Sequence, residues 1–151
     1  MSLFGKDAVL YYSTTLLDDS NTADTVTWVE QDNISDLTDN FSPTEVDITT
    51  RATAKLGWEA SATVLKSGEI RFTMMALHGD DFVDAIFDAF LNSTPLALMD
   101  LSAANTVEGA FGLAANFSVS LSHAKPVKGV QTLDITLKVY SFPEWVVSEG
   151  V

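Results

Sequence analysis

Residues 45–75 read EVDITTRATAKLGWEASATVLKSGEIRFTMM and decide the fold class, because three short runs within them alternate apolar and polar residues. Such alternation predicts β-strands with one buried and one solvent-facing side. The runs are 45–50, 59–65 and 69–75. Lys66-Ser67-Gly68 supplies small, conformationally permissive residues, so we predict a tight hairpin between the last two runs. The stretch carries no catalytic group, which indicates a module that builds surfaces.

Five further strands are predicted in the rest of the chain, at 7–13, 25–31, 96–100, 112–122 and 130–141. The last two are the longest and the most regular, and a turn at 125–129 separates them. Residues 81–91 place apolar side chains at helical spacing with Asp84 and Asp88 on the other face, so they predict a helix with Asp80 as its N-cap. The expected fold is mainly β (α+β): an antiparallel β-sandwich or partly closed barrel with one flanking α-helix.

Composition limits the function. The 151 residues indicate one domain, 1–151, and 46% of them are hydrophobic, which suffices for a sizeable core. A net charge of −13 argues against a protein that binds nucleic acid by neutralising its phosphates. The chain has no cysteine, so disulfides and thiol chemistry are excluded. No segment is apolar enough to span a bilayer, and we expect a cytoplasmic product with no membrane partner.

Charge is unevenly distributed along the chain. Residues 1–50 contain ten acids and one base, whereas residues 51–71 contain four bases and two acids. A self-complementary, head-to-tail contact between copies uses such asymmetry. Two solvated loops of opposite sign are the alternative explanation.

The segment Glu45-Val-Asp-Ile-Thr-Thr-Arg51, followed by Gly57-Trp58-Glu59 and alternating runs, resembles the major tail (tail tube) proteins of long-tailed bacteriophages. With the order of strands and the single helix, the likeness covers roughly residues 25–140. The resemblance implies a structural virion protein rather than an enzyme. Its copies would close rings, six to a ring, and the rings would stack into a tube through which DNA is ejected. It also implies synthesis in the host cytoplasm and a place in the virion tail.

The resemblance implies these partners: other copies of the chain, further tail proteins such as the tape measure, tail tip and terminator, and DNA as transiting cargo. The stacking loop would be residues 51–58, with Arg51, Lys55, Leu56 and Trp58 as contact residues. Those bases would meet an acidic patch at Asp32, Asp36 and Asp39. The polar strand faces provide the candidates for the lumen: Asn116, Ser118, Ser120, Thr132, Asp134 and Thr136. The apolar C-terminal tail, 142–151, offers Phe142 and Trp145 for docking.

Two alternatives to a phage tail tube remain at this point. One is a tube protein of a contractile injection or type VI secretion system. The other is a stand-alone ligand-binding or carbohydrate-binding β-sandwich, for which Trp28, Trp58 and Trp145 would supply an aromatic platform.

Candidate chemical sites are weak, and we expect no metal, cofactor or catalytic residue. His78-Gly79-Asp80-Asp81 coincides with the predicted helix start, so capping explains it better than metal binding. The run 32–39 lacks the spacing of a calcium loop and is interpreted as a solvated turn.

Overall fold

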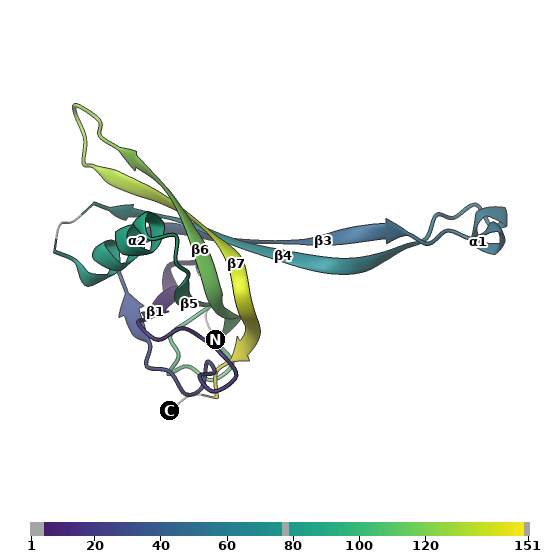
Figure 1. Ribbon diagram of the computed structural model, residues 1–151, viewed down its shortest axis with the longest axis horizontal. Coiled ribbons are helices and arrows are strands. Elements are labelled where there is room, and N and C mark those ends of the chain that lie inside the picture. The colour runs from purple at the N-terminus through teal and green to yellow at the C-terminus, as the bar shows by residue number, and fades with distance from the viewer. Residues whose placement is uncertain (1–4, 77–78, 150–151) are drawn as a thin grey trace.

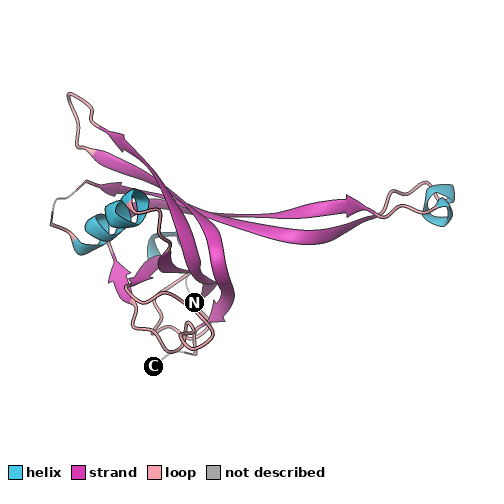
Figure 2. Cartoon of the chain, in the orientation of Figure 1, coloured by secondary structure: helices cyan, strands magenta, loops and turns pink. Residues whose placement is uncertain are grey.

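The structure is a computed structural model that describes residues 5–76 and 79–149, and its centre is one seven-stranded antiparallel sheet. The strand order is β2-β1-β5-β6-β7-β4-β3 (Figures 1 and 2). The strands are β1 (Val9–Ser13), β2 (Val29–Gln31), β3 (Ile34–Asp47), β4 (Ser61–Met75), β5 (Leu96–Leu101), β6 (Phe111–Ala124) and β7 (Thr132–Val147). The helices are η1 (Gly5–Asp7), α1 (Arg51–Lys55) and α2 (Asp81–Leu91).

The predicted class, antiparallel β with one flanking helix, is confirmed, and its strands belong to a single sheet. Helix α2 has the predicted bounds, and the Asp80 carboxylate accepts hydrogen bonds from the backbone N–H groups of Phe82 (2.9 Å) and Val83 (3.4 Å). These bonds satisfy donors that a helix start leaves unpaired. His78 lies outside the described residues.

Two apolar clusters cover the two faces of the sheet. On one face the buried side of α2 packs against the sheet, where the Phe82 ring lies 5.0 Å from Tyr12 and 6.0 Å from Phe72. On the other face segment 14–28 lies over β1, β5 and the start of β6, and it buries Leu17 and Ala23 against Met99. Burial on both faces explains why all six residues of β5 are buried.

The β3–β4 hairpin projects far beyond the body of the sheet and ends in α1 (Figure 1). In this arm, which we define as residues 40–68, β3 pairs with β4 from Asn40↔Glu69 to Asp47↔Ser61. The predicted hairpin turn at Lys66–Gly68 is therefore wrong: these residues are extended in mid-strand, and Ser67 pairs with Ser42. A Cβ on Gly68 would lie 3.0 Å from Val139 Cγ2 and 3.3 Å from Phe41, so this glycine makes room for side chains and does not form a turn.

Two other predicted boundaries differ from the structure. The run 32–39 is not a solvated turn, because β3 begins at Ile34 and continues through Asp36, a bulge residue with φ 54°. The strand predicted at 25–31 is confined to Val29–Gln31. The residues before this strand belong to segment 14–28, the covering segment on one face of the sheet. Within it, Trp28 Nε1 donates a hydrogen bond of 2.8 Å to the Ala23 carbonyl oxygen.

Gly112 lies where the backbones of β6 and β5 approach too closely for a side chain to fit. An added Cβ there would meet the backbone oxygen of Asp100 in the paired strand β5. We expect Gly112→Ala to lower the free energy of unfolding by about 3 kcal/mol or more, because both strands are central and neither can retreat. Urea unfolding monitored by circular dichroism measures the change. Gly5→Ala, which places a methyl group in open space, is the control, and equal midpoints for the two variants would refute this account.

Candidate assembly surfaces

The tip of the arm, residues 50–58, presents two bases and two large apolar side chains. A capping box begins helix α1. The Thr50 hydroxyl accepts a hydrogen bond from the backbone N–H of Thr53, and the Thr53 hydroxyl accepts one from the backbone N–H of Thr50. The predicted stacking loop therefore contains one helical turn, which holds Arg51 and Lys55 four residues apart on the same side. Leu56 and Trp58 follow, and they are 76% and 73% exposed.

Beyond its base, where Phe41 lies beside Trp145, the arm has no packing partner among the described residues of its own chain. Nearly every residue of 40–67 is exposed. The exposed apolar side chains are those of Phe41, Val46, Ile48, Val64 and Leu65. An isolated two-stranded hairpin is marginally stable in water. Apolar side chains on both faces of such a hairpin indicate a surface that another chain covers.

The predicted acidic patch lies at the other end of β3 from the arm tip. Asp32 is in the turn before β3, and Asp36 and Asp39 are in the first half of that strand. Asp39 also has a neighbour that the sequence did not suggest, the buried carboxyl of Asp100. Burial is the main cause that raises the pKa of Asp100 to about 9, and the hydrogen bond and charge of Asp39 contribute in the same direction.

Five of the six lumen candidates share one open face of β6 and β7. Ser118, Ser120 and Asp134 are exposed, and Thr132 and Thr136 are half-buried. The face continues onto β4, where Arg71 pairs with Thr136 in register and forms a salt bridge of 3.1 Å with Glu69. The Asp134 carboxylate accepts a hydrogen bond of 2.9 Å from the Thr73 hydroxyl.

The structure corrects the prediction for Asn116, the sixth lumen candidate. It is 3% exposed because segment 14–28 covers this part of β6. Its side chain accepts from the Leu17 N–H and donates to the Leu17 carbonyl oxygen, both at 2.8 Å. Asn116 therefore anchors the covering segment and does not face a lumen.

Part of the predicted C-terminal tail is a strand, because residues 142–147 are the end of β7 and residues 144–147 pair with the start of β6. Docking by Phe142 and Trp145 stays a prediction. The Trp145 ring lies 5.9 Å from Phe111 and 6.4 Å from Phe41, yet 57% of its surface is exposed. Phe142 is 47% exposed and has φ 51°. A cavity of about 530 Å³ separates the base of the arm from this part of β7, and Phe41, Pro43, Val139, Pro143 and Trp145 line it.

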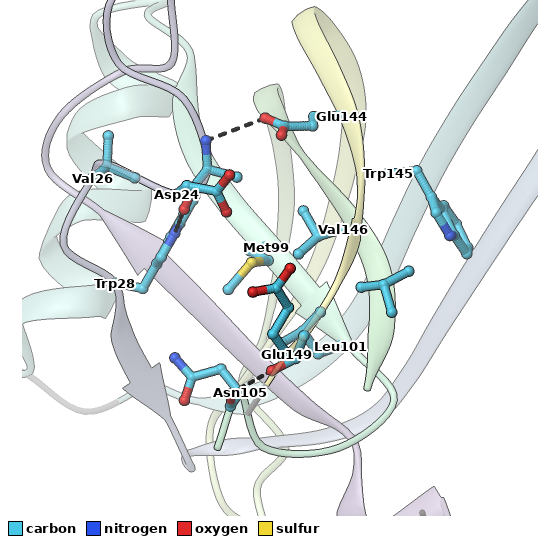
Figure 3. A pocket seen from close by; sticks show the side chains of 13 residues that line it. Asp24, Val26, Trp28, Met99, Leu101, Asn105, Glu144, Trp145, Val146 and Glu149 are labelled. Atoms are coloured by element: carbon cyan, nitrogen blue, oxygen red, sulfur yellow. Dashed lines mark hydrogen bonds between the residues drawn. The ribbon is translucent and has the colours of Figure 1, made fainter. Parts of the chain in front are cut away.

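A second cavity, of about 700 Å³, lies between segment 23–28 and the end of β7 (Figure 3). The side chains of Trp28, Met99 and Val146 form part of its lining, with the acids Asp24, Glu144 and Glu149 around them. Glu144 Oε2 accepts a hydrogen bond of 3.2 Å from the Ala23 N–H and so fastens the segment to β7. The cavity is thus a seam between the covering segment and the sheet.

The three indoles do not form one platform. Trp28 and Trp145 line the seam, whereas Trp58 is at the arm tip, at the far end of the molecule (Figure 1). Over residues 5–76 and 79–149, no group of three or more His, Cys, Asp or Glu side chains is placed to hold a metal ion. Within the same ranges no helix is long and apolar enough to cross a membrane.

Solved structures with this fold come from phage-like tails. No protein-family model and no curated protein matches the chain. The tail of an empty GTA particle, computed with helical refinement and C6 symmetry, matches with a TM-score of 0.72 at 13% identity, over 97% of this chain and 100% of that one. The virion of a native gene transfer agent (GTA) particle matches at 0.70 and 13%, with the same coverage. The SPP1 tail tube matches at 0.64 and 16%, over 99% of this chain and 81% of that one.

The chain has a tail-tube fold. The fold expected from the resemblance is therefore confirmed, although at these identities the comparison establishes the architecture and leaves individual contact residues as predictions.

Asp100 makes stability depend on pH. The native state keeps a proton on this carboxyl where the unfolded chain has lost it, so native stability falls as pH rises from about 4 to about 9. We expect Asp100→Asn to flatten this decline and to raise the melting temperature more at about pH 8.5 than at about pH 5. Thermal unfolding at the two pH values tests this, with exposed Glu108→Gln as the control. A destabilised Asp100→Asn variant at the higher pH would contradict the assignment.

Proposed function

We propose that this protein is the subunit of a phage-type tail tube, a non-enzymatic structural protein that assembles into stacked rings. The observation that carries the proposal is the arm: a long two-stranded projection with exposed apolar side chains on a fold shared with assembled tails. A monomer gains nothing from such an arm, whereas a stacked assembly buries it.

Ring closure is proposed to use two open sheet edges. The outer edge of β3 has no partner in the described chain, and β6 has none beyond Phe117 on its β5 side. Joining the β3 edge of one copy to residues 118–124 of the next continues an antiparallel sheet around a ring and removes both edges. The C6 symmetry of the matched GTA tail supports six copies per ring.

The lumen is proposed to be lined by the polar face of β6, β7, β4 and β3. The two bases on this face, Arg71 and Lys138, are balanced by two acids, Glu69 and Asp134. Glu69 forms the salt bridge with Arg71 and lies opposite Lys138 in register. A wall without excess positive charge lets DNA pass without trapping it. The tube then serves as a conduit for DNA ejection in the virion tail, and its ends meet other tail proteins such as the tape measure, tail tip and terminator.

Reversing the charge of the arm tip tests stacking. We expect Arg51→Glu/Lys55→Glu to prevent tube growth. The circular dichroism spectrum should not change, because both side chains lie in α1, which has no buried residues. Negative-stain microscopy of concentrated protein shows the difference. Arg51→Lys/Lys55→Arg keeps both charges and should still form tubes. Normal tube growth of the Glu variant would argue against a stacking role for the tip.

The conduit proposal also predicts weak contact with nucleic acid. With a net charge of −13 and a balanced polar face, assembled tubes should show no measurable DNA affinity at physiological salt. Fluorescence anisotropy with a labelled duplex measures this. Tight binding that weakens as salt is added would count against a non-adhesive lumen.

A further inference from the structure

The arm tip and helix α2 lie at opposite ends of the molecule. In Figure 1, α1 is at the extreme right, while α2 and the β6–β7 turn are at the left. In a head-to-tail stack every copy has the same orientation, so a projection at one end meets the opposite end of the next copy. The receptor of the tip must therefore be sought around α2.

The distribution of charge shows which parts can approach another copy. The arm carries three bases and three acids, and the β6–β7 turn, residues 122–131, carries two bases and no acid. The remaining residues hold eighteen acids and three bases. Bodies with such an excess repel one another, whereas the basic tip of the arm is attracted to an acidic body.

The outer face of α2 is both acidic and open. Asp81, Asp84, Asp88 and Leu91 follow at intervals of three and four residues, so they form one stripe, and all four are exposed. The opposite side of the helix is buried in the core. No described segment of the chain covers the stripe, and neither Asp84 nor Asp88 forms a salt bridge within the described residues.

Apolar surface lies beside these acids. Leu91 is 73% exposed and Phe90 45% exposed, at the C-terminal end of the helix. A neighbouring cavity of about 210 Å³ is lined by Phe90, Pro95, Val119 and Tyr140, among others, and Tyr140 is 66% exposed. This order, acids followed by apolar side chains, matches the order at the arm tip, where the bases of α1 precede Leu56 and Trp58.

The geometry points to the outer face of α2 as the docking site for the arm tip of the adjacent copy in the stack, an inference that rests on the proposed function. Arg51 and Lys55 lie against Asp84 and Asp88, and Leu56 and Trp58 cover Phe90, Leu91 and the cavity beside them. We place the receptor at α2 rather than at the start of β3, where the sequence suggested Asp32, Asp36 and Asp39, because the α2 acids adjoin the exposed side chains of Phe90 and Leu91.

Because the chain has no cysteine, an engineered pair reports this contact directly. In Lys55→Cys/Asp88→Cys, mild oxidation of assembled protein should link each copy to the next, and a ladder of disulfide-bonded multimers should appear on a non-reducing gel. Lys55→Cys/Asp36→Cys is the matched control and should give no ladder. A ladder from the control and none from the α2 pair would overturn the inference and restore the β3 site.

Charge exchange gives an independent test. Asp84→Lys/Asp88→Lys should block tube growth as Arg51→Glu/Lys55→Glu does, and the four substitutions together should restore it. Asp84→Asn/Asp88→Asn, which avoids placing cations near the start of the helix, should weaken growth if the Lys variant folds poorly. If arm variants abolish tubes while every α2 variant assembles normally, the receptor lies elsewhere and stacking stands. If wild-type protein forms no tubes, the proposed function fails with it.

Discussion

The structure depends on one constraint: a two-stranded sheet cannot bury its own side chains. In the body, β4 has β3 on one side and β7 on the other, and its residues Ile70, Phe72 and Met74 are buried under α2 and its neighbours. Toward the arm the pairing with β7 ends at Glu69, and Ser61–Ser67 of the same strand are all exposed. The arm is therefore attached to the sheet at one end only, and in the proposed assembly a second chain covers it.

The body of the sheet supports the base of that projection. Central strands are buried on both faces, and Gly112 lets β6 approach β5 so closely that no side chain fits between their backbones. Phe41 at the base of the arm lies edge-on to Trp145 of β7 and over Gly68, so the arm leaves the sheet beside the cavity of about 530 Å³ that these side chains line.

Sequence periodicity predicted the elements whose two sides differ in environment. Helix α2 and strands β5, β6 and β7 have one or two buried faces, so the spacing of their apolar residues predicted them. Nearly all residues of β3 are exposed, and residues 34–44 do not alternate, so this part of the strand was not predicted, although the run 45–50 does alternate. The same reason explains the misplaced turn at Lys66–Gly68, where small residues looked like a loop because no burial marked them as strand. Asn116 was misassigned because local sequence does not reveal that segment 14–28 folds over it.

In the proposed assembly, the distribution of charge limits which contacts can form. An excess of acids on the body keeps copies apart in every orientation that brings two bodies together, and it disfavours DNA as well. The basic residues are concentrated on projections, so attraction is confined to contacts between a projection and a body. Such a contact is heterologous, since the two surfaces differ, and it repeats without closing. In the proposed tube, a subunit with a basic arm tip and an acidic α2 therefore favours a head-to-tail stack over back-to-back pairs, which would place two acidic faces in contact.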